Sequence, residues 1–328
     1  MPSFLSEMSP SRTPRVVAYR TALFAGFAAL LSACGSESPA PESTAAPQNN
    51  ADSAAEQPVD AVEAPVSPEQ LLTEVLVAQP PEVKERYKWR HPSETLAFFG
   101  VEPGMTVVET DPGAGWYTRI LMQYLGEGGT LIGADYAIDM YPLFNYYSEE
   151  ELAAKASWAE RWPAEMGASG SARAALVGAN IGAISEARNE TVDVYLFVRV
   201  LHNLADFEEE GEYLSAALAE AFRVLKPGGV VGVVQHWSPE ANSGEWASGA
   251  NGYLKKDFVI ARFEEAGFTL DGESSVNENP MDQPSEDEYV WRLPPASEDP
   301  EDPELAAKYL AIGESNRMTL KFRKPVAT

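Results

Sequence analysis

A glycine turn after a short apolar run is the first feature of this chain that could bind a ligand. Val107 lies in an apolar run that predicts a buried strand, and Gly113 and Gly115 follow it. Residues 117–125 then show helical spacing of apolar side chains. Glycines lack a Cβ atom, so a ligand can reach backbone N–H groups at the helix start, where the dipole favours a carboxylate or phosphate. The turn therefore predicts a nucleotide-type site.

The third position of the glycine pattern separates classes of nucleotide. Dinucleotide-binding folds use G-x-G-x-x-G, because the last glycine lets helix and strand pack closely. Thr118 occupies that position here, after the bulky Trp116 and Tyr117. This argues against NAD or FAD. A short-chain dehydrogenase is disfavoured further, because no Tyr-x-x-x-Lys motif is evident.

A carboxylate about twenty residues beyond the turn could complete such a site. The predicted strand at residues 130–134 ends in Asp135. In folds of this kind a carboxylate at this position accepts hydrogen bonds from both ribose hydroxyls. Asp135 alone would be an ordinary turn residue, but together with Glu109 and the glycine pair it favours ribose binding.

The three histidines of the chain could supply acid–base chemistry. His202 and Asn203 follow one apolar run, His236 follows another, and His91 precedes a short predicted helix. A neutral imidazole could take a proton from a hydroxyl or amine acceptor, and Asn203 could orient that acceptor. We expect His202 to be the base, with His236 second and His91 third; bracing a loop is the alternative for each. No H-x-x-H or H-x-x-x-H spacing supports a zinc site.

Alternating strands and helices must position these residues. Strands are predicted at residues 105–109, 130–134, 174–177, 192–198, 230–234, 268–276 and 318–323, the last partly exposed on one face. Helices are predicted at 67–77, 93–99, 117–125, 149–165, 212–225 and 254–266. The pattern predicts an α/β doubly wound sheet with its ligand at the carboxyl ends of the strands. Residues 136–165 could cover the ligand as a lid or pack as an extra helix.

The motifs resemble those of class I S-adenosyl-L-methionine (SAM) dependent methyltransferases. Glu109-x-x-x-Gly113-x-Gly115 resembles their motif I, acidic-x-Gly-x-Gly-x-Gly, with Asp111 at the first glycine position. The phrase Leu-Lys-Pro-Gly-Gly at 225–229, between a helix and an apolar strand, is also similar to that class.

Longer phrases resemble a bacterial family of predicted methyltransferases that are often exported. They lie at residues 90–109, 112–118, 133–136 and 309–324, and the resemblance covers about residue 70 to the end. It implies a Rossmann-like, mostly parallel seven-stranded sheet with an antiparallel last strand. It also implies SAM as the cofactor and methyl transfer to an unidentified small-molecule acceptor. The alternative is a non-catalytic protein that binds a nucleoside or small ligand on the same fold.

The resemblance also implies a set of cofactor-binding residues. Methyltransferases often place an adenine-contacting polar residue after the third strand, where Asn180 stands in this chain. Trp116 and Tyr117 could lie against the sulfonium as a cation–π contact, or they could be core residues of their helix. The expected cofactor-binding residues are Glu109, Asp111, Gly113, Gly115, Tyr117, Thr118, Asp135 and Asn180.

The N-terminus resembles a bacterial lipoprotein signal. Basic residues precede an apolar core at 21–31, and Leu31-Ser-Ala-Cys34 ends the segment. The apolar run is shorter than the ~20 residues of a spanning helix. We expect a signal peptide at 1–33, a tether at 34–66 that begins at a lipidated Cys34, and a methyltransferase-like domain at 67–328. The protein would then face the periplasm, anchored to the membrane through Cys34 only. An ordinary signal peptide or short anchor is the alternative.

Composition limits the partners of the chain. The tether is rich in Ala, Pro, Glu, Ser and Gln and lacks aromatic residues, so it cannot form a core. The formal net charge is −26, and no basic stripe is present to neutralise phosphates. We therefore expect a small-molecule substrate and no nucleic-acid partner.

Overall fold

The computed structural model describes residues 66–297 and 302–326. The predicted signal peptide and residues 34–65 of the tether lie outside the described residues. The sheet has seven strands in the order β3-β2-β1-β4-β5-β7-β6. They are β1 (Thr106–Thr110), β2 (Thr130–Asp135), β3 (Ala175–Asn180), β4 (Val192–Val198), β5 (Leu225–His236), β6 (Thr269–Ser274) and β7 (Arg317–Arg323). Strands β1 to β5 pair in parallel, whereas β7 is antiparallel to both β5 and β6. This confirms the predicted fold class.

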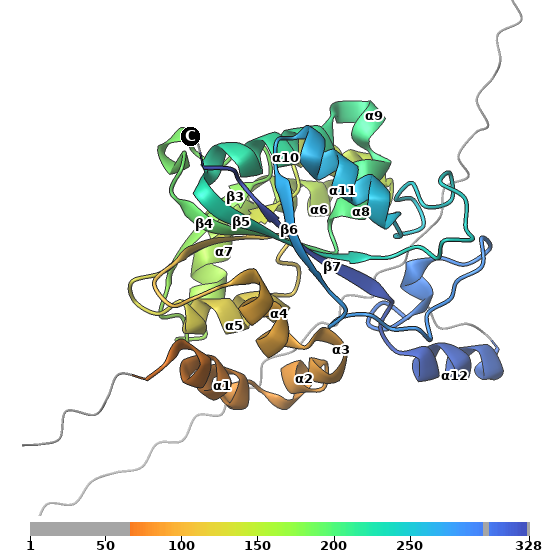
Figure 1. The fold of residues 1–328 in the computed structure, drawn as a ribbon, viewed down its shortest axis with the longest axis horizontal. Coiled ribbons are helices and arrows are strands. Elements are labelled where there is room, and N and C mark those ends of the chain that lie inside the picture. Colours follow the sequence, from red (N-terminus) through yellow and green to blue (C-terminus); the bar gives the residue numbers. More distant parts are fainter. Residues whose placement is uncertain (1–65, 298–301, 327–328) are drawn as a thin grey trace, which may run out of the picture. The chain divides into compact units, whose positions relative to one another are not determined.

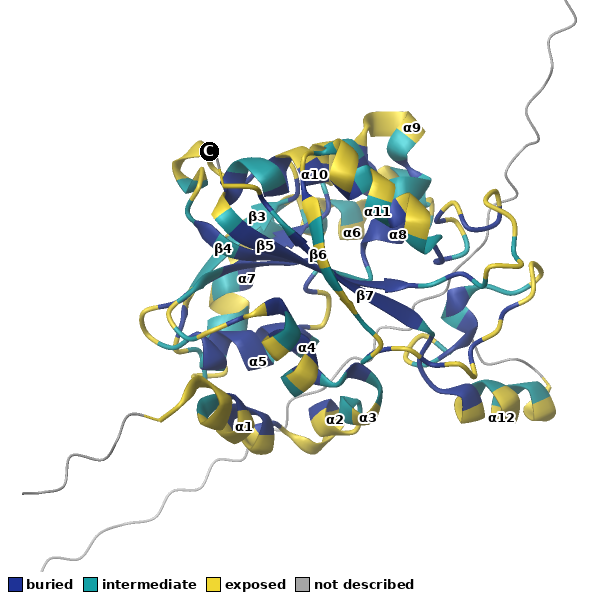
Figure 2. Ribbon diagram, viewed as in Figure 1, coloured by how far each residue is buried: buried dark blue, intermediate teal, exposed yellow. Residues whose placement is uncertain are grey.

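Helices cover both faces of the sheet (Figure 1), and the strands β1, β2, β4 and β5 are mostly buried, whereas β3 and β6 are more exposed. Successive strand residues alternate between the two cores: Val107 belongs to one and Val108 to the other. One core packs against α1 (Pro68–Ala78), α4 (Pro92–Phe99), α5 (Trp116–Tyr124) and α7 (Trp158–Gly167). The other packs against the 3-10 helix η1 (Ile138–Phe144), α8 (Leu201–Asp206), α10 (Tyr213–Val224) and α11 (Lys256–Glu265). Figure 2 shows the buried sheet between helices whose outer faces are exposed.

Strand β4 illustrates why the run of apolar residues forms this sheet. Tyr195 and Phe197 point into one core, and Val194 and Leu196 into the other. A strand covered on both faces needs apolar residues at every position rather than at alternate positions. The observed bounds of β4 are those predicted from the sequence.

The predicted helix at 149–165 is wrong, because two helices occupy that segment. Helix α6 (Glu149–Ala156) ends at Ser157, and α7 runs on to Gly167, past the predicted end near Pro163. Proline cannot donate to the carbonyl four residues before it. That carbonyl belongs to Ala159 and lies against Gly178 of β3, so α7 tolerates the proline while packing closely on the sheet.

Strand β7 is less exposed than the sequence predicted, because only Lys321 and Arg323 on its polar face are partly accessible. It lies between β5 and β6, and Met318, Leu320 and Phe322 are all buried. Alternation of apolar and polar residues predicted one solvated face, but Thr319 on the other face is buried as well. Pairing on both edges places the whole strand inside the sheet.

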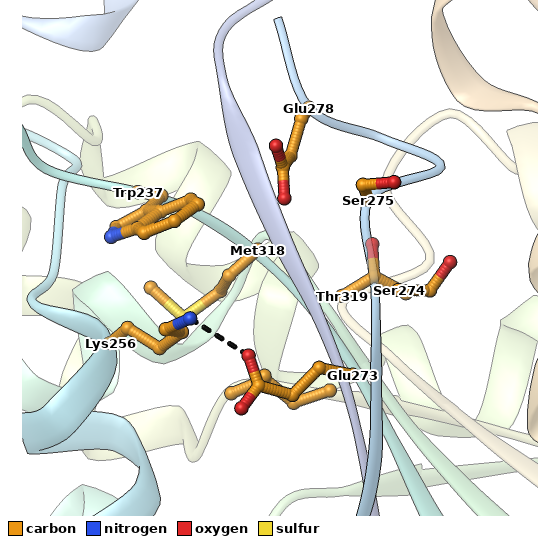
Figure 3. Close-up of a pocket in the computed structure, with 9 residues that line it drawn as sticks. Trp237, Lys256, Glu273, Ser274, Ser275, Glu278, Met318 and Thr319 are labelled. Carbon is orange, nitrogen blue, oxygen red and sulfur yellow. Dashed lines mark hydrogen bonds and ion pairs between the residues drawn. The ribbon is translucent and has the colours of Figure 1, made fainter.

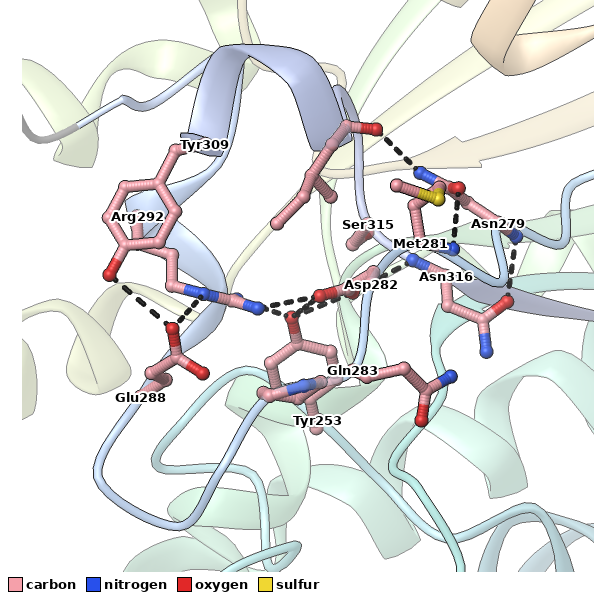
Figure 4. Close-up of polar contacts among 12 residues, drawn as sticks. Tyr253, Asn279, Met281, Asp282, Gln283, Glu288, Arg292, Tyr309, Ser315 and Asn316 are labelled. Atoms are coloured by element: carbon pink, nitrogen blue, oxygen red, sulfur yellow. Dashed lines mark hydrogen bonds and ion pairs between the residues drawn. The ribbon is translucent and has the colours of Figure 1, made fainter. Parts of the chain in front are cut away.

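The long connection between β6 and β7, which begins at residue 275, is anchored by a polar network (Figure 4). Asp282 is fully buried and accepts hydrogen bonds from the Tyr253 hydroxyl, Arg292 Nη2 and the Asn316 backbone N–H. Asn279 Nδ2 donates to the Glu314 carbonyl at 2.7 Å. The network therefore holds the loop that leads into β7.

Short helices complete the described part of the chain. They are α2 (Pro81–Lys84), α3 (Tyr87–Arg90), α9 (Glu208–Gly211), α12 (Pro303–Ile312), and the 3-10 helices η2 (Glu186–Arg188) and η3 (Val290–Arg292). Within residues 66–297 and 302–326, no helix has the length and apolar character needed to cross a membrane.

Candidate functional site

The acidic residue of the glycine motif is tied to the helix that follows the turn. Glu109 is buried in β1, and its Oε2 accepts a hydrogen bond of 2.7 Å from the Thr118 hydroxyl of α5. Burial raises the pKa of Glu109 to about 8, although the Thr118 hydrogen bonds oppose this. Thr118, at the third glycine position, thus fixes α5 against β1.

The two glycines of the turn adopt conformations that favour glycine. Gly113 has φ 53° and Gly115 has φ 77°, both in the left-handed region. A Cβ on Gly115 would lie 2.9 Å from Met166 Cε of α7. A Cβ on Gly113 would meet only the Asp111 carbonyl oxygen, at 3.8 Å. The backbone at Gly113 is therefore open to a ligand, whereas Gly115 packs against α7.

Asp111 and Asp135 lie at the same edge of the sheet, at the ends of neighbouring strands. The Asp111 N–H donates to the Ala134 carbonyl at 2.8 Å. Asp111 Oδ2 lies 3.4 Å from the Tyr136 hydroxyl, which also accepts a hydrogen bond of 2.7 Å from Asn203 Nδ2. Burial, and then the charge of Asp135, raise the pKa of Asp111 to about 6. The turn and the predicted ribose carboxylate are thus adjacent, as the sequence implied.

Asp135 already has a cationic partner. It is buried at the end of β2, and its Oδ2 lies 3.0 Å from Nζ of Lys155 on α6. The Lys155 ammonium also lies 4.5 Å from the centre of the Tyr141 ring. Sequence reasoning missed Lys155, although it falls within the segment considered as a lid. The ammonium donates a hydrogen bond to the same carboxylate that is predicted to bind the ribose hydroxyls.

The remaining predicted cofactor residues divide into two groups. Asn180 ends β3 opposite Asp135, and its Nδ2 donates to the Tyr136 carbonyl at 2.7 Å. Tyr117 instead belongs to the core beneath α5, where its ring meets Trp116 edge-on at 4.7 Å. The structure therefore brings Asn180 to the carboxylates and packs Tyr117 as a core residue.

A family comparison agrees with this geometry. Residues 110–233, from the end of β1 into β5, match the family described as "Methyltransferase domain". This segment, which is less than half of the chain, is therefore similar to a methyltransferase domain. The match confirms the enzyme class predicted from the sequence and, with it, SAM as the cofactor. A search of curated proteins found no match.

Solved structures are similar to this chain at low identity. A SAM-dependent methyltransferase from Aquifex aeolicus is 18% identical, with 77% of this chain and 98% of that chain covered and a TM-score of 0.46. An arsenic(III) SAM methyltransferase from Chlamydomonas reinhardtii is 16% identical, with coverages of 80% and 74% and a TM-score of 0.41. The geranyl diphosphate C-methyltransferase of Streptomyces coelicolor is 12% identical, with coverages of 81% and 89% and a TM-score of 0.44.

The residues at this edge of the sheet are of chemical types that could bind SAM. Asp135 offers carboxylate oxygens for two hydroxyls, Asn180 lies beside it, and the backbone is open at Gly113. SAM and the Lys155 ammonium would compete for the same carboxylate. The fit therefore requires Lys155 to leave Asp135.

Two of the three histidines lie together beyond the sheet edge. The rings of His202, on α8, and His236, at the end of β5, are 5.3 Å apart. Burial lowers the pKa of His202 to about 4 and that of His236 well below its usual value. His236 Nδ1 shares a hydrogen bond of 2.6 Å with the Ser315 hydroxyl. Both imidazoles are thus neutral at pH 7, as a base requires, but His202 is a weaker base than free histidine. His91 forms the α3–α4 turn, and its Nδ1 is buried without a partner in the described structure.

Two cavities of the domain lie away from the glycine turn. One of about 100 Å³ is lined by residues of β6, β7 and α11, among them Lys256, and by Trp237, which directly follows β5 (Figure 3). Lys256 Nζ there pairs with Glu273 Oε2 at 2.8 Å. The other, of about 370 Å³, lies near residues 226–230, at the start of β5. Neither is lined by Gly113, Asp135 or the histidines.

Proposed function

We propose that this chain transfers the methyl group of SAM to a small-molecule acceptor bound beside His202 and Asn203. The observation that carries this proposal is the adjacency of Asp111 and Asp135 at one edge of the sheet, next to the open backbone of Gly113. Bound SAM supplies an electrophilic methyl group. The chain supplies the groups that bind and orient the reactants.

Each residue at this edge has a role in the proposal. Asp135 accepts hydrogen bonds from the ribose hydroxyls, and Asn180 contacts the base. Asn203, which donates to the Tyr136 hydroxyl, orients the acceptor. His202 takes the acceptor's proton in its neutral form. Because burial weakens this base, most of the rate enhancement comes from holding the two reacting centres in line.

Titration of the full-length chain with SAM and S-adenosylhomocysteine tests this proposal. Calorimetry should give a dissociation constant in the micromolar range, with binding weakened about tenfold or more in Asp135→Asn, since ribose hydrogen bonds to a charged acceptor are lost. Asp193→Asn is the matched control, because Asp193 is a carboxylate on β4 that pairs with Lys226 away from the glycine turn. No binding at millimolar SAM would contradict the proposal.

The alternative function is non-catalytic binding of a nucleoside or small ligand. It is favoured by Asp111, which puts a buried carboxylate where motif I has its first glycine. It is also favoured by the ion pair on Asp135. A binding protein would hold adenosine or S-adenosylhomocysteine as tightly as SAM and release no S-adenosylhomocysteine with any acceptor. Turnover with one acceptor excludes this alternative.

We further propose that the enzyme is exported and lipid-anchored at Cys34. The basic, apolar and small-Cys parts of the first 34 residues occur in the order of a lipoprotein signal. In a bacterial host, labelled palmitate should be incorporated into the wild-type protein and not into Cys34→Ser. Incorporation into both proteins, or into neither, would contradict lipidation at Cys34.

A further inference from the structure

Four arginines from distant parts of the sequence form a cluster beside the histidines. The arginine cluster consists of Arg86 and Arg90 at α3, Arg199 directly after β4, and Arg317 at the start of β7. Arg317 pairs with His236 in the sheet register. The cluster thus lies where β4 and β5 end, the edge at which open sheets bind ligands.

A single carboxylate, that of Glu314, forms ion pairs with three of these arginines. Glu314 accepts from Arg86 Nη1 at 2.8 Å, Arg90 Nε at 3.0 Å and Arg317 Nη1 at 3.1 Å. In the described part of the chain, no other carboxylate forms an ion pair with the cluster. Arg90, Arg317 and Glu314 are each buried. Glu314 therefore leaves the cluster with an excess of positive charge.

Arg199 is the member that forms no ion pair within the described part of the chain. Its side chain makes no ion pair or hydrogen bond with residues 66–297 or 302–326. Burial, and then the charge of Arg199, lower the pKa of Arg90 to about 9. Arg317 Nε is buried without a hydrogen-bond partner. Unpaired cationic groups in a partly buried cluster are costly unless an anion joins them.

The strongly negative net charge of the chain makes the small number of carboxylates paired with the arginine cluster unexpected. A chain with a formal charge of −26 has many carboxylates, yet among residues 66–297 and 302–326 only Glu314 forms an ion pair with the cluster. Asp111 and Glu314 attract Arg199 from beyond ion-pair distance, and the Asp111 carboxylate faces the Tyr136 hydroxyl. If the cluster served only to pair Glu314 with cations and hold the fold, the other three arginines would be sufficient without Arg199.

We propose that the arginine cluster, with Arg199 as its free donor, binds an oxyanion on the methyl acceptor, which therefore carries a carboxylate or phosphate group. This inference rests on the proposed function. A guanidinium fork matches either oxyanion with two parallel hydrogen bonds. Arg199 lies three residues before His202 and four before Asn203. An anion held by Arg199 thus places the rest of the acceptor near both side chains.

Calorimetric titration of the full-length chain with inorganic phosphate and with malonate tests the site without knowledge of the acceptor. We expect at least one anion to bind with a dissociation constant of about 1 mM or less, and Arg199→Gln to weaken it about tenfold. Arg188→Gln is the matched control, since Arg188 is also partly buried but precedes β4 at its other end. Binding by neither anion at about 10 mM, or equal binding by Arg199→Gln, overturns the inference.

A second experiment tests whether the oxyanion belongs to the acceptor or to the cofactor, because SAM also carries a carboxylate. We expect phosphate or malonate to bind protein saturated with S-adenosylhomocysteine as well as it binds free protein. Competitive displacement of the anion would assign the cluster to the cofactor and overturn the inference. If the protein binds SAM but no anion, only the anion site is refuted. If it binds an anion but not SAM, the proposed function is refuted, and with it the assignment of the anion to a methyl acceptor.

Discussion

Lys155 Nζ lies 3.0 Å from Asp135 Oδ2, so the carboxylate predicted to bind ribose is held by a side chain of the helix above it. Asp135 is almost fully buried, whereas the Lys155 side chain is 27% exposed. The pair links the end of β2 to the start of the α6–α7 segment, whose second helix reaches Gly115 through Met166. The α6–α7 segment therefore contacts both Asp135 and Gly115 of the predicted cofactor site, while α7 packs on the sheet.

Removal of this ammonium should strengthen cofactor binding. In Lys155→Met, SAM no longer has to displace a cation from Asp135, so we expect its dissociation constant to fall several-fold. Calorimetry with SAM measures this change. Lys84→Met, at an exposed lysine of α2, should leave the constant unchanged. Weaker SAM binding by Lys155→Met would mean that the lysine holds the cofactor instead of blocking it.

Close packing of α7 on the sheet predicts a strong effect at Gly178. A Cβ added there would lie 1.9 Å from the Ala159 carbonyl oxygen, a backbone atom that cannot turn aside. We expect Gly178→Ala to lower the free energy of unfolding by about 3 kcal/mol or more. Gly167→Ala, where a Cβ would meet nothing within 4 Å, should change it by about 0.5 kcal/mol at most. Urea unfolding followed by circular dichroism compares the two, and equal values would refute the packing argument.

Burial of Glu109 predicts a pH-dependent stability. Because burial raises the pKa of Glu109 to about 8 in the folded protein, the folded state binds a proton more tightly than the unfolded chain. This carboxyl therefore favours folding at low pH, and the benefit is lost as the pH rises from about 4.5 to about 8. Glu109→Gln should be more stable relative to wild type at pH 8 than at pH 5. Urea unfolding at both pH values tests this, and a pH-independent difference would contradict it.

The proposed base predicts a specific kinetic pattern. With its pKa lowered by burial to about 4, His202 stays neutral down to about pH 5, so protonation of His202 should not reduce turnover between pH 8 and pH 5.5. Once an acceptor is identified, His202→Ala should lower turnover and leave SAM affinity intact. Release of S-adenosylhomocysteine and SAM titration measure the two effects. Equal loss of both would show that His202 only supports the fold.

The sequence was most informative where structure depends on local pattern. The bounds of β4 were predicted because Val192–Val198 is apolar except at Asp193, and the glycine turn because Gly113 and Gly115 follow a strand directly. By contrast, the break at Ser157 was missed because the apolar spacing runs through it. The buried position of β7 depends on pairing with two strands that precede it in the chain.

The site could be predicted only where a motif names its residues. The positions of Asp111 and Asp135 followed from the order of strands, because neighbouring parallel strands end at the same edge. The partners of those residues did not follow from any pattern. Lys155 reaches Asp135 from a separate helix, and Arg199 meets Arg317 only after the sheet has assembled. Tertiary structure brings such groups together, and no sequence motif links residues that are so far apart in the chain.

The internal position of β7 has a consequence for synthesis of the protein. Its residues, Arg317–Arg323, follow the other six strands in the chain, yet they join β5 to β6. A nascent chain on the ribosome therefore lacks the segment that closes its sheet until the other six strands have been synthesised. A stop codon anywhere before residue 317 would leave β5 and β6 without their common neighbour and expose two unpaired strand edges, which are templates for aggregation.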